Sequence, residues 1–169
     1  MSNTIEQLIE NPNFNRTRIW AKKRGILIKG NEETQVFKLI EEFGELCGGI
    51  LKLKEDIIID SVGDMVVVLV NLNKVKGFDL EYGIEFKDMN QITTSKQCLK
   101  ALNDCINDLL HNCNRVLPVI NYSNMIINLL TKLCGLQGLD INNCFNFAYN
   151  EIKNRTGKNV DGNFIKDEA

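Results

Sequence analysis

Apolar residues recur every three or four positions through most of the chain, which is the spacing of amphipathic helices. The alternating pattern of β-strands is scarce, and only two prolines occur in 169 residues. The expected helices cover residues 16–24, 31–53, 57–76, 94–117, 123–134 and 140–154, after a short turn around 5–9. The pattern therefore predicts an all-α helical bundle that forms a single domain over residues 1–169.

Residues suited to N-capping precede four of these helices: Asn31, Thr94 or Ser95, Ser123 and Asp140. Pro118 predicts a break between the helices on either side of it, because proline cannot donate the backbone hydrogen bond of a helix interior. After the last helix, residues 158–169 are expected to form a polar tail that is anchored by Val160 and Phe164.

The second long helix has an apolar stripe that is expected to face the core: Leu39, Phe43, Leu46, Ile50 and Leu53. Beside this stripe lie one basic and three acidic residues: Lys38, Glu41, Glu42 and Glu45. Taken alone, these carboxylates are typical of the solvated flank of an amphipathic helix. The next helix makes a second interpretation possible.

Residues 62–70 of that next helix are apolar on nearly every side, so neighbouring elements should bury it. Asp60 and Asp64 interrupt it one turn apart, and burying two like charges is costly unless a cation compensates them. Carboxylate oxygens favour Mg²⁺ or Mn²⁺, and Mg²⁺ commonly joins carboxylates to substrate phosphates. The pattern predicts either a divalent-metal site for a phosphate-bearing substrate or a structural network of ion pairs.

Two motifs carry a family resemblance. KLIEEFGEL (38–46) and DSVGDMVVVL (60–69) resemble the E-x-x-E and E-x-x-D helix pair of the MazG-like nucleotide pyrophosphohydrolases, especially the small phage-type members. WAKKRGIL (20–27) and AYNEIKNRTGK (148–158) are similar to the flanks of that subgroup.

The resemblance covers about residues 1–80 and 136–166, so residues 86–133 are expected to be a helical insertion. It implies the fold of the all-α NTP pyrophosphatases, a homodimer or a dimer of dimers, and use of Mg²⁺. The implied reaction is the hydrolysis of a nucleoside triphosphate, (d)NTP, to the monophosphate, (d)NMP, and pyrophosphate. The alternative is a catalytically weak protein of the same fold that sequesters a nucleotide or a signalling ligand.

Carried over residue by residue, Glu42 and Glu45 match the first acidic pair of the family and Asp64 matches the final aspartate. The remaining family glutamate falls at Ser61, and serine is a poor metal ligand. Asp60 lies one residue earlier, on the helix face of Asp64. We expect Asp60 to supply the missing carboxylate.

Further residues are candidates for catalysis or for binding the substrate. Glu41 is placed to orient or deprotonate the attacking water, or else it faces solvent. The candidates for binding phosphate are basic: Lys38, Lys74, Lys153, Arg155 and Lys158. The last three of these residues are equally typical of a helix end followed by a solvated tail.

Trp20 and Arg24, one turn apart, are candidates for holding a base or a phosphate, although a single tryptophan is also typical of a core. Asn71 lies on the face of Asp64 and is a candidate for binding a sugar or a base. A satisfied buried amide is the alternative for this residue.

The composition argues against several classes of protein. Lys plus Arg (20) nearly balance Asp plus Glu (22), which argues against a general nucleic-acid binder. No apolar run approaches the ~20 residues of a membrane span. The six cysteines lack C-x-x-C spacing, and the N-terminus lacks a signal pattern. Both features favour reduced thiols in the cytoplasm. If the protein is phage-encoded, as the resemblance to the phage-type members implies, this is the cytoplasm of the host.

Overall fold

The computed structural model describes residues 2–29, 31–160 and 163–167, with the side chains of residues 4–28, 31–157, 164, 165 and 167. Its helices are α1 (Ser2–Ile9), α2 (Asn13–Lys23), α3 (Ile26–Lys29), α4 (Glu32–Lys52), α5 (Glu55–Val75), η1 (Leu80–Gly83), α6 (Ser95–Asn112), α7 (Val116–Gln137) and α8 (Ile141–Ile152). Two short strands follow, β1 (Gly157–Val160) and β2 (Asn163–Lys166), which pair antiparallel. The fold is an all-α bundle, as predicted.

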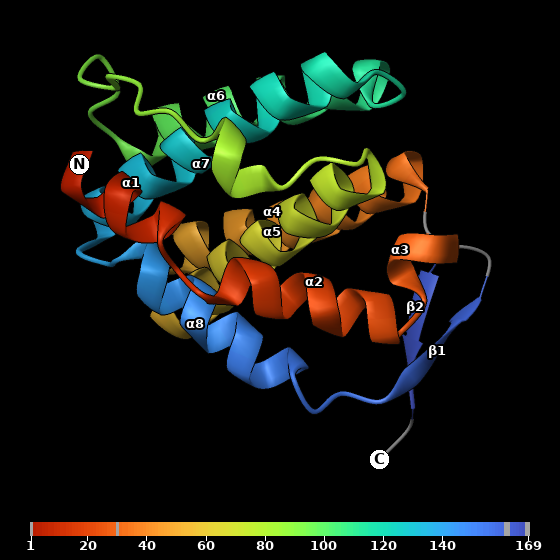
Figure 1. The fold of residues 1–169 in the computed structure, drawn as a ribbon. Coiled ribbons are helices and arrows are strands. Elements are labelled where there is room, and N and C mark those ends of the chain that lie inside the picture. Colours follow the sequence, from red (N-terminus) through yellow and green to blue (C-terminus); the bar gives the residue numbers. More distant parts are fainter. Residues whose placement is uncertain (1, 30, 161–162, 168–169) are drawn as a thin grey trace.

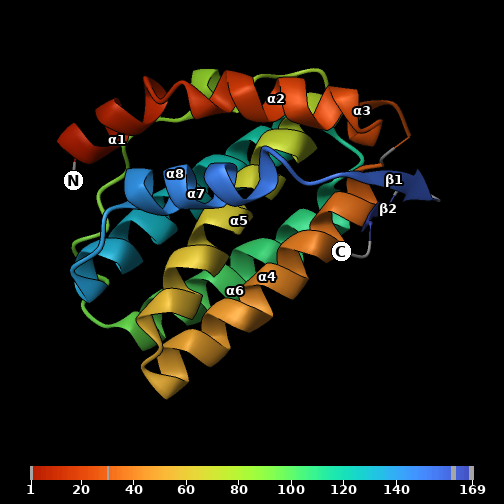
Figure 2. The ribbon, with the colours of Figure 1, turned by 90° about the horizontal axis from the view of Figure 1, so that it is seen from below.

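Helix α5 lies at the centre of the bundle, with α4 packed along it and α2, α7 and α8 on its other sides (Figure 1). Its segment Val62–Val70 is buried, as its apolar sequence predicts. Helices α6 and α7 pair with each other and cover α4 and α5 (Figure 2). Within the described chain, no helix combines the length and the apolar character that crossing a membrane requires.

Glycine makes the crossing of α5 and α8 possible. A Cβ atom at Gly63 would lie 2.2 Å from the backbone oxygen of Cys144 and 2.7 Å from the Cβ of Ala148. The two backbones therefore approach more closely than any larger residue permits. This contact fixes α8 against the half of α5 that carries Asp64.

Three of the four predicted N-caps are confirmed. The side chain of Asn31 accepts a hydrogen bond from the Thr34 N–H, and Thr94 forms a capping box with Gln97. Asp140 accepts from the N–H groups of Asn142 and Asn143. Each cap satisfies a donor that the first helical turn leaves free.

The prediction for residues 113–123 was wrong. The break between α6 and α7 lies at residues 113–115, and Pro118 sits in the first turn of α7, where its missing N–H costs no hydrogen bond. Ser123 is buried inside α7 and accepts a hydrogen bond from Asn73 Nδ2 at 2.8 Å. Because Asn73 of α5 supplies a hydrogen-bond partner, Ser123 is accommodated inside α7 and does not cap a helix.

The expected polar tail is instead the β1–β2 hairpin, whose backbone groups pair from Gly157 with Lys166 to Val160 with Asn163. The anchor Phe164 packs against the core, and its ring meets that of Trp20 edge-on at 5.7 Å between centroids. The side chain of Val160 lies outside the described residues. All six cysteines have free thiols.

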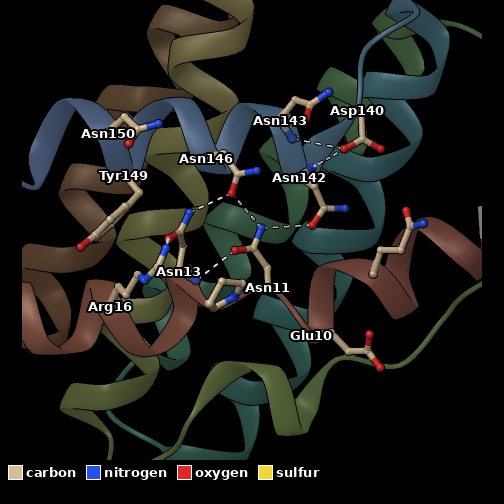
Figure 3. Close-up of a pocket in the computed structure, with 12 residues that line it drawn as sticks. Glu10, Asn11, Asn13, Arg16, Asp140, Asn142, Asn143, Asn146, Tyr149 and Asn150 are labelled. Carbon is tan, nitrogen blue, oxygen red and sulfur yellow. Dashed lines mark hydrogen bonds between the residues drawn. The ribbon is translucent and has the colours of Figure 1, made fainter.

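An asparagine-lined cleft of about 740 Å³ lies where the α1–α2 corner meets α8 (Figure 3). Asn11 Nδ2 donates to Asn142 Oδ1 at 3.2 Å and to Asn146 Oδ1 at 3.1 Å, and Asn13 Nδ2 donates to Asn146 Oδ1 at 2.8 Å. Arg16 donates to Asn13 Oδ1. These amides clamp the N-terminal corner to α8.

Candidate functional site

A second cavity, of about 250 Å³, lies between α4, α5 and the C-terminal part of the chain. Six of the predicted site residues line it: Trp20, Lys38, Glu42, Asp64, Asn71 and Arg155. The remaining lining residues are Ile26, Thr34, Gln35, Val67, Val68, Ile152 and Phe164. The cavity therefore joins both acidic helices to segments that are distant in the sequence.

Helices α4 and α5 bring their acidic residues to one wall. Glu42 is on α4, where its side chain is 12% exposed, and Asp64 faces the same space from α5. Gly63, next to Asp64, allows α8 to pack against α5, and Ile152 at the end of α8 reaches the cavity.

Burial and neighbouring carboxylates shift both carboxyl groups toward their neutral forms. Burial, and then the charge of Asp64, raise the pKa of Glu42 to about 7, although Lys38 opposes the shift. Burial, and then the charge of Asp60, raise the pKa of Asp64 to about 6, while Arg155 and Lys38 oppose it. A further cation bound beside this pair would stabilise the charged forms of both carboxyl groups.

Two basic residues border the carboxylates. Lys38 Nζ pairs with Glu41 and lies 3.7 Å from Glu42 Oε1. Arg155 also lines the cavity, close enough to Asp64 to oppose the rise of its pKa, and its backbone oxygen accepts hydrogen bonds from Nε and Nη2 of Arg24. The cavity thus carries both the acids that suit a metal ion and the bases that suit phosphate.

Two further residues that line the cavity, Trp20 and Asn71, each have a buried polar atom without a hydrogen-bond partner. Trp20 is 7% exposed and its Nε1 donates to no partner, while Asn71 is 4% exposed and its Oδ1 accepts from none. Leaving buried polar atoms unpaired costs about 1–3 kcal/mol each. A donor and an acceptor free in one cavity are suited to the polar edge of a bound ligand.

Several predicted site residues lie outside this lining. Glu41 and Glu45 are exposed on α4. Asp60 is half-buried, and the charges of Asp60 and Glu45 are close enough to raise the pKa of Asp64. None of these three acids lines the cavity.

The remaining predicted bases are engaged elsewhere. Lys74 donates to Asp79 Oδ1 at 2.8 Å, and the exposed Lys153 donates to Asn150 Oδ1 at 2.8 Å. Arg24 stacks on the Trp20 ring, with Cζ 5.1 Å from the ring centroid, and holds the chain at Arg155 instead of lining the cavity. The side chain of Lys158 lies outside the described residues.

Sequence reasoning missed Gln35 and did not assign Phe164 to the site. Gln35 is 5% exposed and lies four residues before the buried Leu39 on α4, so its signal was a polar residue on an apolar stripe. The site role of Phe164 had no local signal, because the hairpin brings it to Trp20 from the far end of the chain.

Ser61, which occupies the position of a family glutamate, is 1% exposed, and its Oγ has no hydrogen-bond partner. Within the described part of the chain, no three His, Cys, Asp or Glu side chains converge closely enough to hold a metal ion. Glu42 and Asp64 nevertheless line one cavity and offer the oxygen donors that Mg²⁺ prefers. Burial and the neighbouring acids disfavour the charged forms of both carboxyl groups, and a bound cation would relieve this.

Fold and site together define an all-α bundle with an acid-lined cavity. No protein-family model matches the chain, and no solved structure matches it. A 75-residue segment is 43% identical to a protein of Haemophilus phage HP1 (strain HP1c1), described as an uncharacterized 18.2 kDa protein in the rep-hol intergenic region. The match spans 44% of this chain and 43% of that protein, so less than half of each is related by sequence.

Proposed function

We propose that the protein is a magnesium-dependent nucleoside triphosphate pyrophosphohydrolase, which converts (d)NTP and water to (d)NMP and pyrophosphate. One observation carries this proposal: a single cavity combines two repelling carboxyl groups, two bases and two unpaired polar atoms. Such a substrate requires acidic groups for the metal ion, basic groups for the phosphates and polar atoms for the nucleoside.

Glu42 and Asp64 would hold Mg²⁺ or Mn²⁺, with Asp60 and Glu45 as further acidic groups nearby. Bound there, the metal would neutralise phosphate charge and lower the pKa of a water molecule. Lys38 and Arg155 would bind phosphate oxygens. Glu41, which pairs with Lys38, is the proposed base that takes the proton of the attacking water.

In the proposed reaction, the water oxygen forms a bond to the α-phosphorus and the bond to the bridging oxygen of the β-phosphate breaks. Pyrophosphate leaves with the electron pair of that bond. Trp20 and Asn71 would hold the base or the sugar, so that the triphosphate lies beside the acids. The resemblance to the MazG-like enzymes supports the same assignment.

A second candidate is a nucleotide-binding protein with weak or no turnover. Ser61 favours it, because the buried hydroxyl replaces a carboxylate that the resemblance implies for the metal site. The two candidates share the cavity and differ in whether pyrophosphate is released.

The test is pyrophosphate release from a panel of ribo- and deoxyribonucleoside triphosphates, with and without Mg²⁺. Turnover that requires Mg²⁺ and is lost in Glu42→Ala and Asp64→Ala supports the enzyme. Asp108→Ala, which changes an exposed acid on α6, is the matched control. Tight nucleotide binding without pyrophosphate release supports the second candidate. If the protein shows no binding and no release, both candidates are contradicted.

Similarity to a phage protein supports a place in the host cytoplasm during infection or lysogeny. We also propose that the protein forms a homodimer or a dimer of dimers and that it binds neither nucleic acid nor a membrane.

A further inference from the structure

The asparagine-lined cleft carries a regular row of side-chain amides along α8. Asn142, Asn146 and Asn150 all line the cleft, and their spacing of four residues places them one after another along the helix (Figure 3). These three residues are called the amide row below. The cleft shares no lining residue with the cavity of Glu42 and Asp64, so an inference about it does not rest on the proposed function.

Hydrogen bonds across the cleft fix the orientation of two of these amides. Asn11 Nδ2 donates to Oδ1 of Asn142 and to Oδ1 of Asn146. Asn13 Nδ2 donates to the same oxygen of Asn146 at 2.8 Å. Because the oxygen of each amide is engaged by the N-terminal corner, the NH₂ group is the end that remains for an incoming molecule. Amides that are already oriented lose little conformational entropy when they bind.

The NH₂ groups of the amide row retain free hydrogen atoms. In the described part of the chain, the bonds of Asn146 and Asn150 use Oδ1, which in Asn150 accepts from Lys153, and none uses Nδ2. Nδ2 of Asn142 lies 3.5 Å from the backbone oxygen of Thr4, which engages at most one of its two hydrogen atoms. The row therefore presents a series of amide donors.

We propose that the amide row is a docking site for an extended peptide segment of a partner protein, whose backbone carbonyl groups accept hydrogen bonds from the three NH₂ groups. Four residues of an α-helix rise about 6 Å, and two residues of an extended strand span about 6.6 Å. Carbonyl groups two residues apart on a strand point to the same side. Successive amides therefore meet every second carbonyl group, and the row matches about four residues of peptide.

The charges of the cleft indicate which peptide fits. Glu10 and Asp140 line it near the Asn142 end, and Arg16 lines it near the Asn150 end (Figure 3). Two acids against one base do not suit a phosphate backbone, whereas a peptide backbone is neutral. Charge complementarity then favours a segment with a basic side chain toward the Asn142 end and an acidic side chain toward the Asn150 end. The hydroxyl groups of a sugar lie too close together to match the spacing of the row.

The first test selects ligands for the 169-residue chain from a library of randomised ten-residue peptides and measures their affinities by fluorescence anisotropy. Asn146→Asp and Asn150→Asp keep the oxygens that accept from Asn13 and Lys153 and replace each NH₂ donor by an acceptor. Each variant is expected to bind the selected peptides at least ~3-fold more weakly, and the double variant at least ~10-fold. Asn143→Asp adds the same charge to the cleft outside the amide row and should bind like the wild type.

A scan of the peptide backbone tests the spacing of the row. One amide of a selected peptide at a time is replaced by an ester, whose carbonyl oxygen is a weaker hydrogen-bond acceptor. Affinity is expected to fall about 3-fold at every second position over a stretch of about four residues, and to stay unchanged at the positions between them.

Three results overturn the proposal: no peptide is selected, the folded Asn146→Asp and Asn150→Asp variants bind the selected peptides as the wild type does, or the effects of the esters do not alternate. Circular dichroism shows whether each variant is folded. Binding to an oligosaccharide array that is lost in Asn150→Asp also overturns it, because the amide row would then serve a sugar.

Discussion

Two polar cavities of this protein, the asparagine-lined cleft and the cavity of Glu42 and Asp64, differ in how their buried atoms are satisfied. In the asparagine-lined cleft, Asn11, Asn13, Asn142 and Asn146 bind one another, and none of the buried atoms that lack a partner in the described chain belongs to it (Figure 3). In the cavity of Glu42 and Asp64, two carboxyl groups repel and two polar atoms are free. The hydrogen bonds in the larger cavity stabilise the fold, and the unpaired polar groups of the smaller cavity are suited to a ligand.

The largest difference should appear in turnover. We expect Glu42→Gln and Asp64→Asn each to lower kcat for pyrophosphate release at least ~100-fold, because each removes a charge that stabilises the bound metal and phosphates. Asn146→Ala in the amide-lined cleft should leave kcat unchanged at a temperature where it is folded. Steady-state kinetics would measure both, and equal losses in the two cavities would contradict the comparison.

The second difference concerns stability. Asn13→Ala should lower the free energy of unfolding by about 1–3 kcal/mol, because Asn146 and Arg16 lose a buried partner. Asn71→Ala should lower it less or not at all, because the variant also removes the buried Oδ1 that has no partner, and this offsets the loss of side-chain packing. Urea unfolding of both variants gives the values. A larger loss for Asn71→Ala would mean that this amide also has a structural role.

Trp20→Phe tests the free indole donor. We expect nucleotide affinity to fall about 3–10-fold, the value of one neutral hydrogen bond, while the folded state keeps its ring contact with Phe164. Calorimetric titration with a non-hydrolysable triphosphate would measure the change. Phe78→Leu, in a groove that shares no lining residue with the cavity, provides a control for aromatic replacement. An unchanged affinity in Trp20→Phe would assign this residue to the core alone.

The smallest effect is a pH dependence of stability in metal-free protein. The pKa of Glu42 rises from 4.5 to about 7 on folding and that of Asp64 from 3.8 to about 6. The folded state therefore holds protons that the unfolded chain releases. The resulting stabilisation is full below the ordinary pKa values and is lost as the pH rises through about 6 to 7.

In Glu42→Gln, one side chain stays neutral at every pH. We expect its Tm in a chelator to exceed that of the wild type by a few degrees above pH 7, and the two curves to converge in acid. Glu151→Gln, on the exposed face of α8, should follow the wild type throughout. Thermal unfolding monitored by circular dichroism would show the difference, and parallel curves for Glu42→Gln and the wild type would contradict it.

Much of the helical framework follows from local sequence. Apolar spacing predicted the long helices, and Asn31, Thr94 and Asp140 begin them because their side chains satisfy nearby N–H groups. The buried character of residues 62–70 and the placement of Asp64 on that helix also followed from the pattern. These features involve residues within a few turns of one another, which the sequence records directly.

Only the tertiary structure decided which residues share the cavity. Lys74 was expected there and pairs with Asp79, while Arg155 and Phe164 reach Trp20 from the other end of the chain. A residue on an amphipathic helix has several possible neighbours. Packing between segments more than 100 residues apart in the sequence selects among them. The sequence determined the helices and their acidic faces, and long-range packing determined which of those acidic residues line the cavity.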